Sequence, residues 1–519
     1  MRWRNEVVCL LWLMLNCAAI AGEKPNIVLI MADDMGYADL GCFGGELQTP
    51  HLDGLAARGL RWTQFYNGAQ CCPTRAALLT GMYAHQAGIG DMVDGHSKAT
   101  RDAAASPQYA TELKKNALTI AEHLRPAGYQ NFMTGKWHVG YDDGERPIHR
   151  GFDRYFGIIG GADSYWEPKS LREDDRPIQV DPKNFYATDD FTTRAMQFIR
   201  ERETMQPFFL YIAFNAPHSP LHARDEDIQR IGNRYVVGWD VIRRQRFEKM
   251  KQLGILPSHA TLPPADSASH SWESEPDKPK RIERMTKYAA MVERMDWNIG
   301  RLLELLDQQS IADNTLVVFL SDNGAWASEA TYGHDWAEAS SPFRYFKTWT
   351  HEGGIRTPLI VSWPAQLKDR GRIETRHYGH IIDLLPTFLA AADALPVTTG
   401  DVLPQEGRSL LAGFTRQGDH TNVPRFWERL GHGAMRDGDW KLVRVFNEGR
   451  GAQQPAERKG PWELYNLSAD PTEIRNLADQ HPEQIATMRA QYEAWERRIG
   501  VVDREIILKR IAANGLKNE

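Results

Sequence analysis

The chain has 519 residues, of which 42% are apolar and 25% are charged, and both proportions are ordinary for a globular protein. The formal net charge of −6 argues against a nucleic-acid-binding protein, which needs a basic face. Five cysteines, two of them within the first 20 residues, are too few for a disulfide framework, so the core must stabilise the fold.

The first 22 residues predict an export signal. Arg2 and Arg4 give a positive start, Val7–Ile20 is almost wholly apolar, and Ala19-Ile20-Ala21 fits a cleavage site with small residues. The apolar run is short for a membrane-spanning helix, and no later stretch is long and apolar enough to span a bilayer. We therefore expect residues 1–22 to be removed and the protein to be exported, periplasmic or secreted, without stable membrane insertion.

From residue 26 onward, short apolar runs alternate with helical stretches, of which Tyr288 to Leu306 is the clearest. The runs are typical of strands buried on both faces: Asn26–Met31, Phe208–Phe214, Leu316–Leu320 and Leu359–Ser362. This alternation predicts an α/β fold with a large, mostly parallel mixed sheet flanked by helices. From about Pro424 the pattern predicts a smaller antiparallel α+β subdomain. We expect a main domain over 23–423 and the C-terminal subdomain over 424–519.

The segment Cys71-Cys72-Pro73-Thr74-Arg75 precedes an apolar run that ends at Thr80-Gly81. Pro73 suits the first position of a helix, which would place both cysteines just before a helix N-terminus. Free N–H groups and the helix dipole favour an anion at that point. Arg75, one turn into the helix, can reach back with a planar, always-charged side chain. Taken alone, the segment is equally consistent with a buried pair of small apolar cysteines.

Polar side chains follow four of the predicted strands at the points where the strands end. They are Asp33 and Asp34, Lys136 and His138 after the short apolar pair Phe132-Met133, His218, and Asp322 and Asn323. Open α/β sheets place their ligand sites outside the carboxyl ends of the strands. We therefore expect these groups to converge with Cys71 on one edge of the sheet.

The oxygen-bearing members of this set predict a metal site. They are Asp33, Asp34, Asp322 and Asn323. A set with no soft ligand suits Ca²⁺, with Mg²⁺ second, and disfavours zinc. Without a cation, these crowded carboxylates would repel one another. The alternative is that Asp33-Asp34 caps a helix and Ser321–Gly324 is a simple turn.

Taken together, these motifs resemble formylglycine-dependent sulfatases of the arylsulfatase type, in the alkaline-phosphatase superfamily. The resemblance runs from about Pro25 to the C-terminus. It rests on Asp33-Asp34, Cys71 to Gly81, Gly135 to Gly140, Ala216-Pro217-His218, Ser321 to Gly324, Lys347 with His351 to Arg356, Met435 to Leu442, and Glu463 to Leu467. It implies an alkaline-phosphatase-like fold and an enzyme that hydrolyses aryl or carbohydrate sulfate monoesters to an alcohol and inorganic sulfate.

The resemblance also implies a modification and a metal. A formylglycine-generating enzyme would oxidise Cys71 to an aldehyde, whose hydrate is the nucleophile in this family. The calcium ligands would be Asp33, Asp34, Asp322 and Asn323 together with the modified Cys71.

The remaining site residues receive roles from the same resemblance. Arg75 and His138 would hold and deprotonate the hydrated aldehyde. Lys136 and Lys347 would neutralise charge on the sulfate oxygens. His218 would protonate the departing alcohol.

Two other functions stay open at this point. A phosphonate or phosphate ester hydrolase could use the same scaffold and the same aldehyde, because sulfate and phosphate esters share a tetrahedral shape. A non-catalytic binder of sulfated glycans would leave Cys71 unconverted, but it would have no need for His138 and His218. The sequence does not identify the alcohol that is released, although Tyr165, Trp166 and Trp336 could stack on a sugar or an aryl ring.

Overall fold

A computed structural model describes residues 24–92, 106–110, 112–265, 269–327, 342–417, 421–446, 462–506 and 509. The predicted export signal, residues 1–22, and Trp336 both lie outside these ranges. Within them, no helix combines the length and the apolar character that a membrane crossing requires.

The main sheet contains eleven strands in the described ranges, in the order β10-β2-β9-β8-β1-β7-β3-β4-β5-β6, with β11 paired to β2. The strands are β1 (Asn26–Ala32), β2 (Leu60–Tyr66), β3 (Gln130–Gly135), β4 (Arg154–Ile158), β5 (Leu171–Glu173), β6 (Arg176–Pro177), β7 (Phe208–Ala213), β8 (Thr315–Ser321), β9 (Arg356–Ser362), β10 (Arg372–Glu374) and β11 (Gly379–His380). The central strands β8, β1, β7, β3 and β4 pair in parallel. The predicted mostly parallel sheet is therefore confirmed. In contrast, β9, which contains the run Leu359–Ser362, is antiparallel to both of its neighbours.

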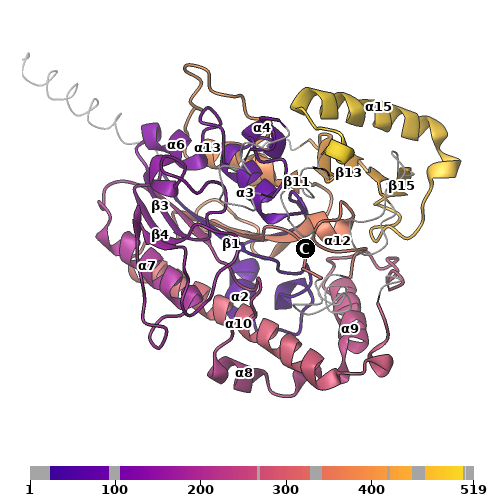
Figure 1. Ribbon diagram of the computed structural model, residues 1–519, viewed down its shortest axis with the longest axis horizontal. Coiled ribbons are helices and arrows are strands. Elements are labelled where there is room, and N and C mark those ends of the chain that lie inside the picture. The colour runs from indigo at the N-terminus through magenta and orange to yellow at the C-terminus, as the bar shows by residue number, and fades with distance from the viewer. Residues whose placement is uncertain are drawn as a thin grey trace, which may run out of the picture.

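The central strand β1 shows why the apolar runs are uninterrupted. Its residues alternate between two hydrophobic clusters, with Val28 and Ile30 in one and Leu29 and Met31 in the other. Helices α2, α7, α9 and α10 cover the first face of the sheet, and α3, α6 and α13 cover the second (Figure 1). A strand covered on both faces needs an apolar residue at every position.

The helices are α2 (Pro50–Arg58), α3 (Cys71–Thr80), α4 (Ala84–Ala87), α6 (Ile120–Leu124), α7 (Ala187–Glu201), α8 (Asp225–Ile231), α9 (Trp239–Gln252), α10 (Lys278–Gln308), α12 (Glu352–Ile355), α13 (Leu384–Ala391), α14 (Leu411–Thr415) and α15 (Pro482–Ile499). Short 3-10 helices occupy Gly41–Phe43, Arg125–Ala127, Pro147–His149, Arg234–Val237, Trp272–Ser274, Ile381–Asp383 and Ala478–Gln480. The predicted helix from Tyr288 to Leu306 is confirmed, but α10 begins ten residues earlier, where the Asp277 side chain accepts a hydrogen bond from the Lys280 N–H.

The start of α3 differs from the expectation. The helix begins at Cys71 rather than at Pro73, so the two cysteines form its first turn. Proline is tolerated there because the first N–H groups of a helix have no partner within the helix. The cysteines therefore belong to the end of the helix itself and do not precede it.

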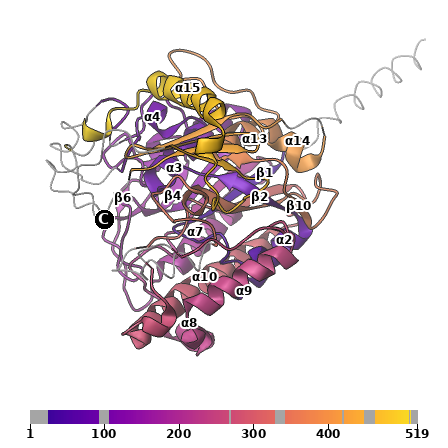
Figure 2. The same ribbon diagram turned by 90° about the vertical axis from the view of Figure 1, so that its right-hand side faces the viewer.

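The C-terminal part forms a second, antiparallel sheet, as predicted. Its strands follow one another in the order β12 (Arg425–Arg429), β13 (His432–Asp437), β14 (Trp440–Arg444) and β15 (Trp462–Asn466). Helix α15 packs on β13 and β14, at the opposite end of the molecule from α8 (Figure 2). The Trp427 indole N–H donates to the Asn67 carbonyl at 2.8 Å, which links this sheet to the segment before α3. The boundary at residue 423 stays a prediction.

Candidate active site

The carboxyl end of the parallel strands is where the predicted site residues meet. Asp33 and Asp34 follow β1 directly, Lys136 follows β3, and Asp322 follows β8. Backbone hydrogen bonds hold these strand ends together: Asp33 N–H donates to Ala216 O at 3.0 Å, and Asp322 N–H donates to Ala32 O at 3.1 Å. The predicted convergence on one edge is what the structure shows.

The direction of β9 brings the remaining groups to the same edge. Because β9 runs against β8, its first residue, and not its last, lies at this end of the sheet. The segment before β9 carries Lys347, and the Thr348 N–H donates to Ala69 O at 2.8 Å. Strand β2 runs against β9 in turn, so the chain leaves β2 at the site and enters α3 at Cys71.

Two cations contact Asp33 in the interior. Lys136 Nζ lies 2.5 Å from Asp33 Oδ2, and Arg75 Nη2 lies 3.6 Å from the same oxygen. Arg75 also donates to Asp322 Oδ2 at 3.0 Å, so it bridges the ends of β1 and β8. All four of these side chains are fully buried, so each charge depends on the others for its solvation.

A second group of side chains surrounds Asp34. Lys347 Nζ and Asn323 Nδ2 each lie 2.7 Å from Asp34 Oδ1, and His218 Nε2 lies 3.5 Å from Asp34 Oδ2. The backbone of Asp34 has φ 66°, in the left-handed region that Asp tolerates better than most residues. This turn directs the second carboxylate of the pair to a set of partners different from that of the first.

Three buried oxygen atoms at this site accept no hydrogen bond in the described structure: Asp33 Oδ1, Asp34 Oδ2 and Asn323 Oδ1. Leaving buried acceptors unpaired is unfavourable, so such groups call for a partner that the protein does not itself provide. Hard oxygen donors are the ligands that Ca²⁺ takes. The residues therefore fit a hard cation.

The pKa values of the carboxyl groups point the same way. Burial would raise the pKa of Asp33, but Lys136, His218 and Arg75 together hold it below its usual range. Burial and the neighbouring Asp33 carboxylate raise the pKa of Asp322 well above its usual value. The site therefore has one firmly ionised carboxylate and a second that is crowded by it, and a cation would relieve this repulsion.

Cys71 is 1% exposed and lies within the field of the two lysines. A hydrogen bond from Cys72 lowers the pKa of the Cys71 thiol well below its usual value, against the effect of burial, and Lys136, Lys347 and His138 add to this lowering. The encoded residue is thus held in a pocket that favours negative charge at its side-chain tip.

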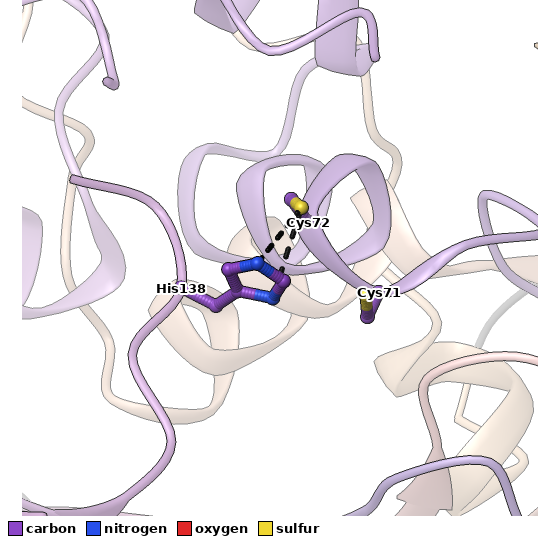
Figure 3. A group of neighbouring side chains, drawn as sticks. All are labelled: Cys71, Cys72 and His138. Atoms are coloured by element: carbon purple, nitrogen blue, oxygen red, sulfur yellow. Dashed lines mark hydrogen bonds between the residues drawn. The ribbon is translucent and has the colours of Figure 1, made fainter. Parts of the chain in front are cut away.

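His138 lies against the first turn of α3 (Figure 3). Its Nε2 and Nδ1 atoms are 3.4 and 3.7 Å from Cys72 Sγ, whereas the family resemblance implies that this histidine acts on residue 71. The backbone of His138 has φ 60°, and a side chain at Gly161 would collide with the imidazole, so both segments are shaped around the ring. Close packing of the ring against the helix places it beside both cysteines.

The structure corrects one expected rim residue, Tyr165, and adds one, Trp326. Tyr165 is 1% exposed and donates to the carbonyl oxygens of Asn215 and His218, at 2.5 and 2.8 Å, so the idea that it stacks on substrate was wrong. Trp166 remains half-buried beside Tyr186. Trp326 lies 5.2 Å from Lys347 Nζ, and its place three residues after Asn323 could have suggested this contact.

A buried hydrogen-bond network behind the proposed metal ligands holds the turn after Asp34. Tyr288 Oη of α10 lies 2.5 Å from Asp39 Oδ2 and accepts from the Gly36 N–H at 3.3 Å. Arg246 Nη1 of α9 donates to Asp39 Oδ1 at 2.6 Å. Two helices thus fix the loop that presents the paired aspartates.

Comparison with known proteins agrees with this site. Residues 25–394 match the protein family described as Sulfatase, and residues 342–497 match the family described as N-sulphoglucosamine sulphohydrolase, C-terminal. The chain belongs to the sulfatase family. The sulfatase is therefore a sulfuric ester hydrolase with the fold that its sequence predicts, and it acts on sulfate esters.

Three relatives illustrate the similarity. An uncharacterized sulfatase of Schizosaccharomyces pombe is 33% identical over 534 residues, covering 92% of this chain and 95% of its own. The arylsulfatase of Klebsiella aerogenes is 34% identical over 435 residues, covering 75% of this chain and 92% of its own. The crystal structure of Ps i-CgsB in complex with k-i-k-neocarrahexaose superimposes with a TM-score of 0.68 at 27% identity, covering 91% of this chain and 92% of that one.

Proposed function

We propose that this sulfatase hydrolyses sulfate monoesters of aryl or carbohydrate alcohols with a formylglycine made from Cys71 and a bound Ca²⁺ ion. One observation carries the proposal. Cys71, at the start of α3, lies near two lysines and beside the strand ends where three buried oxygen atoms accept no hydrogen bond. A set of oxygen ligands beside Cys71 would let a calcium ion and the modified side chain act on the same sulfate group.

Asp33, Asp34, Asp322 and Asn323 would hold the ion, together with the modified residue 71. When present, the ion supplies Lewis-acid polarisation of a sulfate oxygen, and formylglycine supplies a hydroxyl nucleophile. Mg²⁺ fits less well because it demands a smaller, regular octahedral shell.

The chain's own residues then divide the remaining work. Lys136 and Lys347 hold positive charge where the sulfate oxygens lie, and both keep their protons because Asp33 and Asp34 raise their pKa values against the effect of burial. Arg75 holds the site between β1 and β8, and His138 takes a proton from residue 71. His218, which approaches from the Asp34 side, delivers a proton to the departing oxygen.

The substrate class rests on the relatives. One is named an arylsulfatase, and one was crystallised with an oligosaccharide, so the proposal includes both aryl and carbohydrate sulfates. A formylglycine-generating enzyme is the proposed maturation partner. Export to the periplasm or the medium follows from residues 1–22, where the sequence predicts a cleaved signal.

Mass spectrometry of the peptide that contains Cys71 tests the central step. In active protein, residue 71 should carry the aldehyde or its hydrate, and Cys71→Ala should abolish sulfate release without unfolding the protein. Cys72→Ala is the matched control and should keep most of the activity. Full activity from a protein whose residue 71 is an unmodified thiol would overturn the proposal.

A parallel assay separates this function from the phosphorus alternative. Nitrophenyl sulfate, nitrophenyl phosphate and a nitrophenyl phosphonate ester differ in the central atom and its charge but release the same phenolate. Faster turnover of either phosphorus ester would reassign the enzyme.

A further inference from the structure

Four soft donor side chains gather beside the first turn of α3, apart from the oxygen cradle. Donor atoms of Cys71, Cys72 and His138 all lie within 4.8 Å of one another. Met92 Sδ is 3.7 Å from Cys71 Sγ and 3.4 Å from Cys72 Sγ. Figure 3 shows the imidazole facing this turn of the helix, with Cys72 directly against it.

Three of the distances between these donors are close to those of a metal coordination shell, and the donor atoms of Cys71, Cys72 and His138 stay within 4.8 Å of one another. A first-row metal lies about 2.3 Å from sulfur and about 2.0 Å from an imidazole nitrogen, so tetrahedral ligands are separated by roughly 3.5 to 3.8 Å. Here Cys72 Sγ is 3.4 Å from His138 Nε2, and the two sulfur contacts to Met92 are 3.4 and 3.7 Å. The two cysteines and the histidine are at most 1% exposed, so water does not compete strongly for these donors.

We propose that, in the chain whose Cys71 is still a thiol, Cys71, Cys72 and His138 bind one thiophilic cation, foremost Cu⁺, with Met92 as a weak fourth ligand. Thiolate and thioether ligands select such ions, and the thioether favours Cu⁺ over Zn²⁺. Each thiol releases its proton on binding, while the imidazole binds in its neutral form.

The surrounding charges favour the same ion. Two thiolates and Cu⁺ make a centre with one net negative charge, whereas Zn²⁺ would leave it neutral. Lys136 and Lys347 lie in the same buried site, against Asp33 and Asp34. A buried anionic centre is thus stabilised by cations that already lie in the site.

This site shares residue 71 with the proposed calcium site and differs from it in every other donor. The hard cation uses carboxylate and amide oxygens, whereas the soft cation uses sulfur and nitrogen. The inference concerns the encoded thiol and does not depend on the sulfatase mechanism. Where Cys71 is converted to formylglycine, the soft site loses one thiolate, so conversion and tight Cu⁺ binding exclude each other.

The test uses the full chain produced in a host without the converting enzyme, with the Cys71 thiol checked by mass spectrometry. Anaerobic titration with Cu⁺ against the chromophoric chelator bicinchoninate should give one bound ion and thiolate-to-copper charge-transfer absorption. Cys72→Ser should weaken binding by at least about 100-fold, since removal of outer-shell groups alone costs 10- to 100-fold. The thermal unfolding curve of each metal-free variant checks that its fold is intact.

Two controls make the result specific. Cys42→Ser removes a partly exposed thiol outside the cluster and should leave binding unchanged. His138→Asn removes the imidazole and supplies a residue that tolerates the local φ of 60°, so it should weaken binding with the fold intact. Unchanged affinity in Cys72→Ser and His138→Asn, or displacement of Cu⁺ by excess Ca²⁺, would overturn the site. Tighter binding of Zn²⁺ than of Cu⁺ at the same residues would overturn the choice of ion.

Discussion

Two buried clusters of charged side chains differ in how many of their oxygen atoms accept no hydrogen bond. At the active site, three oxygen atoms of Asp33, Asp34 and Asn323 accept no hydrogen bond. In the second cluster, around Lys441 where the two sheets meet, only Glu473 Oε1 among the described carboxylate oxygen atoms accepts no hydrogen bond, and Lys441 Nζ lies 2.8 Å from it and 2.8 Å from Glu352 Oε1. Glu352 Oε2 accepts a hydrogen bond from Tyr66 Oη at 2.9 Å, so both oxygen atoms of this carboxylate have partners.

One carboxyl group of each cluster has a shifted pKa, and these two shifts have opposite directions. Burial would raise the pKa of Glu352, but Lys441, Arg356 and Arg436 hold it below its usual value. Burial and like charge raise the pKa of Asp322 well above its usual value. A cluster in which nearly every oxygen atom has a hydrogen bond stabilises one arrangement of the chain, whereas a cluster with several unpaired oxygen atoms can receive a further cation.

The largest effect on activity should come from changing the active-site cluster. Chelation should remove activity, and added Ca²⁺ should restore it, because the proposed ligands are all oxygen. Asp34→Ala should lower sulfate release by at least about 10³-fold, since it removes a ligand and the partner of Lys347. The measurement is release of nitrophenol from nitrophenyl sulfate before and after metal addition. Restoration by zinc alone would contradict the assignment of the ligands.

The second prediction distinguishes protonation of the leaving group from binding of the sulfate oxygens. His218→Ala should slow hydrolysis of a sugar sulfate by about 10² to 10⁴-fold, the usual range for general acid catalysis. Nitrophenolate leaves without a proton, so nitrophenyl sulfate should be affected much less. Lys136→Ala is the comparison variant and should slow both substrates. Equal losses with His218→Ala on the two esters would show that it binds sulfate and is not the acid.

Changing the cluster around Lys441 should lower the stability of the fold and leave the rate of sulfate hydrolysis unchanged. Glu352→Ala removes the carboxylate that Lys441 and Arg356 both contact and should lower the free energy of unfolding by about 3 to 5 kcal/mol. Urea unfolding measures this change, and activity per folded molecule should stay near that of the unmodified protein. Unaltered stability would mean that water or other side chains already compensate these charges.

The smallest effect should come from the support behind the aspartates. Tyr288→Phe removes the hydroxyl that contacts Asp39 and Gly36 while it keeps the ring in the core. Metal retention should fall by about 10-fold, at the lower end of the range for groups that act through a ligand. Dialysis against a graded series of calcium buffers measures it. Equal loss of metal from Tyr288→Phe and Asp34→Ala would remove the distinction between ligand and support.

The sequence predicts most of the site because its residues follow strands that are buried on both faces. Asp33, Lys136 and Asp322 each end an apolar run, and parallel strands must bring such ends together. The family resemblance, rather than any local pattern, contributes Lys347. The direction of β9 cannot be predicted from the sequence, because a buried antiparallel strand and a buried parallel strand have the same uninterrupted apolar pattern.

Other contacts depend on packing and leave no local signal. Tyr288 belongs to the predicted apolar stripe of its helix, which conceals the polar use of its hydroxyl. Tyr165 looks like a surface aromatic but is buried against the His218 segment. Met92 lies in no motif, and only the folded chain shows its contact with the two cysteines.

The strand order has a consequence for folding kinetics. Neighbours in the centre of the sheet, β8, β1, β7 and β3, are separated by long stretches of chain, and Asn323 donates to Asp34 across 289 positions. Closing such long loops before the contacts form makes topologies of this kind slow to fold. The metal cradle therefore forms only when these distant strands pair, and no fragment that ends before β8 can contain Asp322 and Asn323.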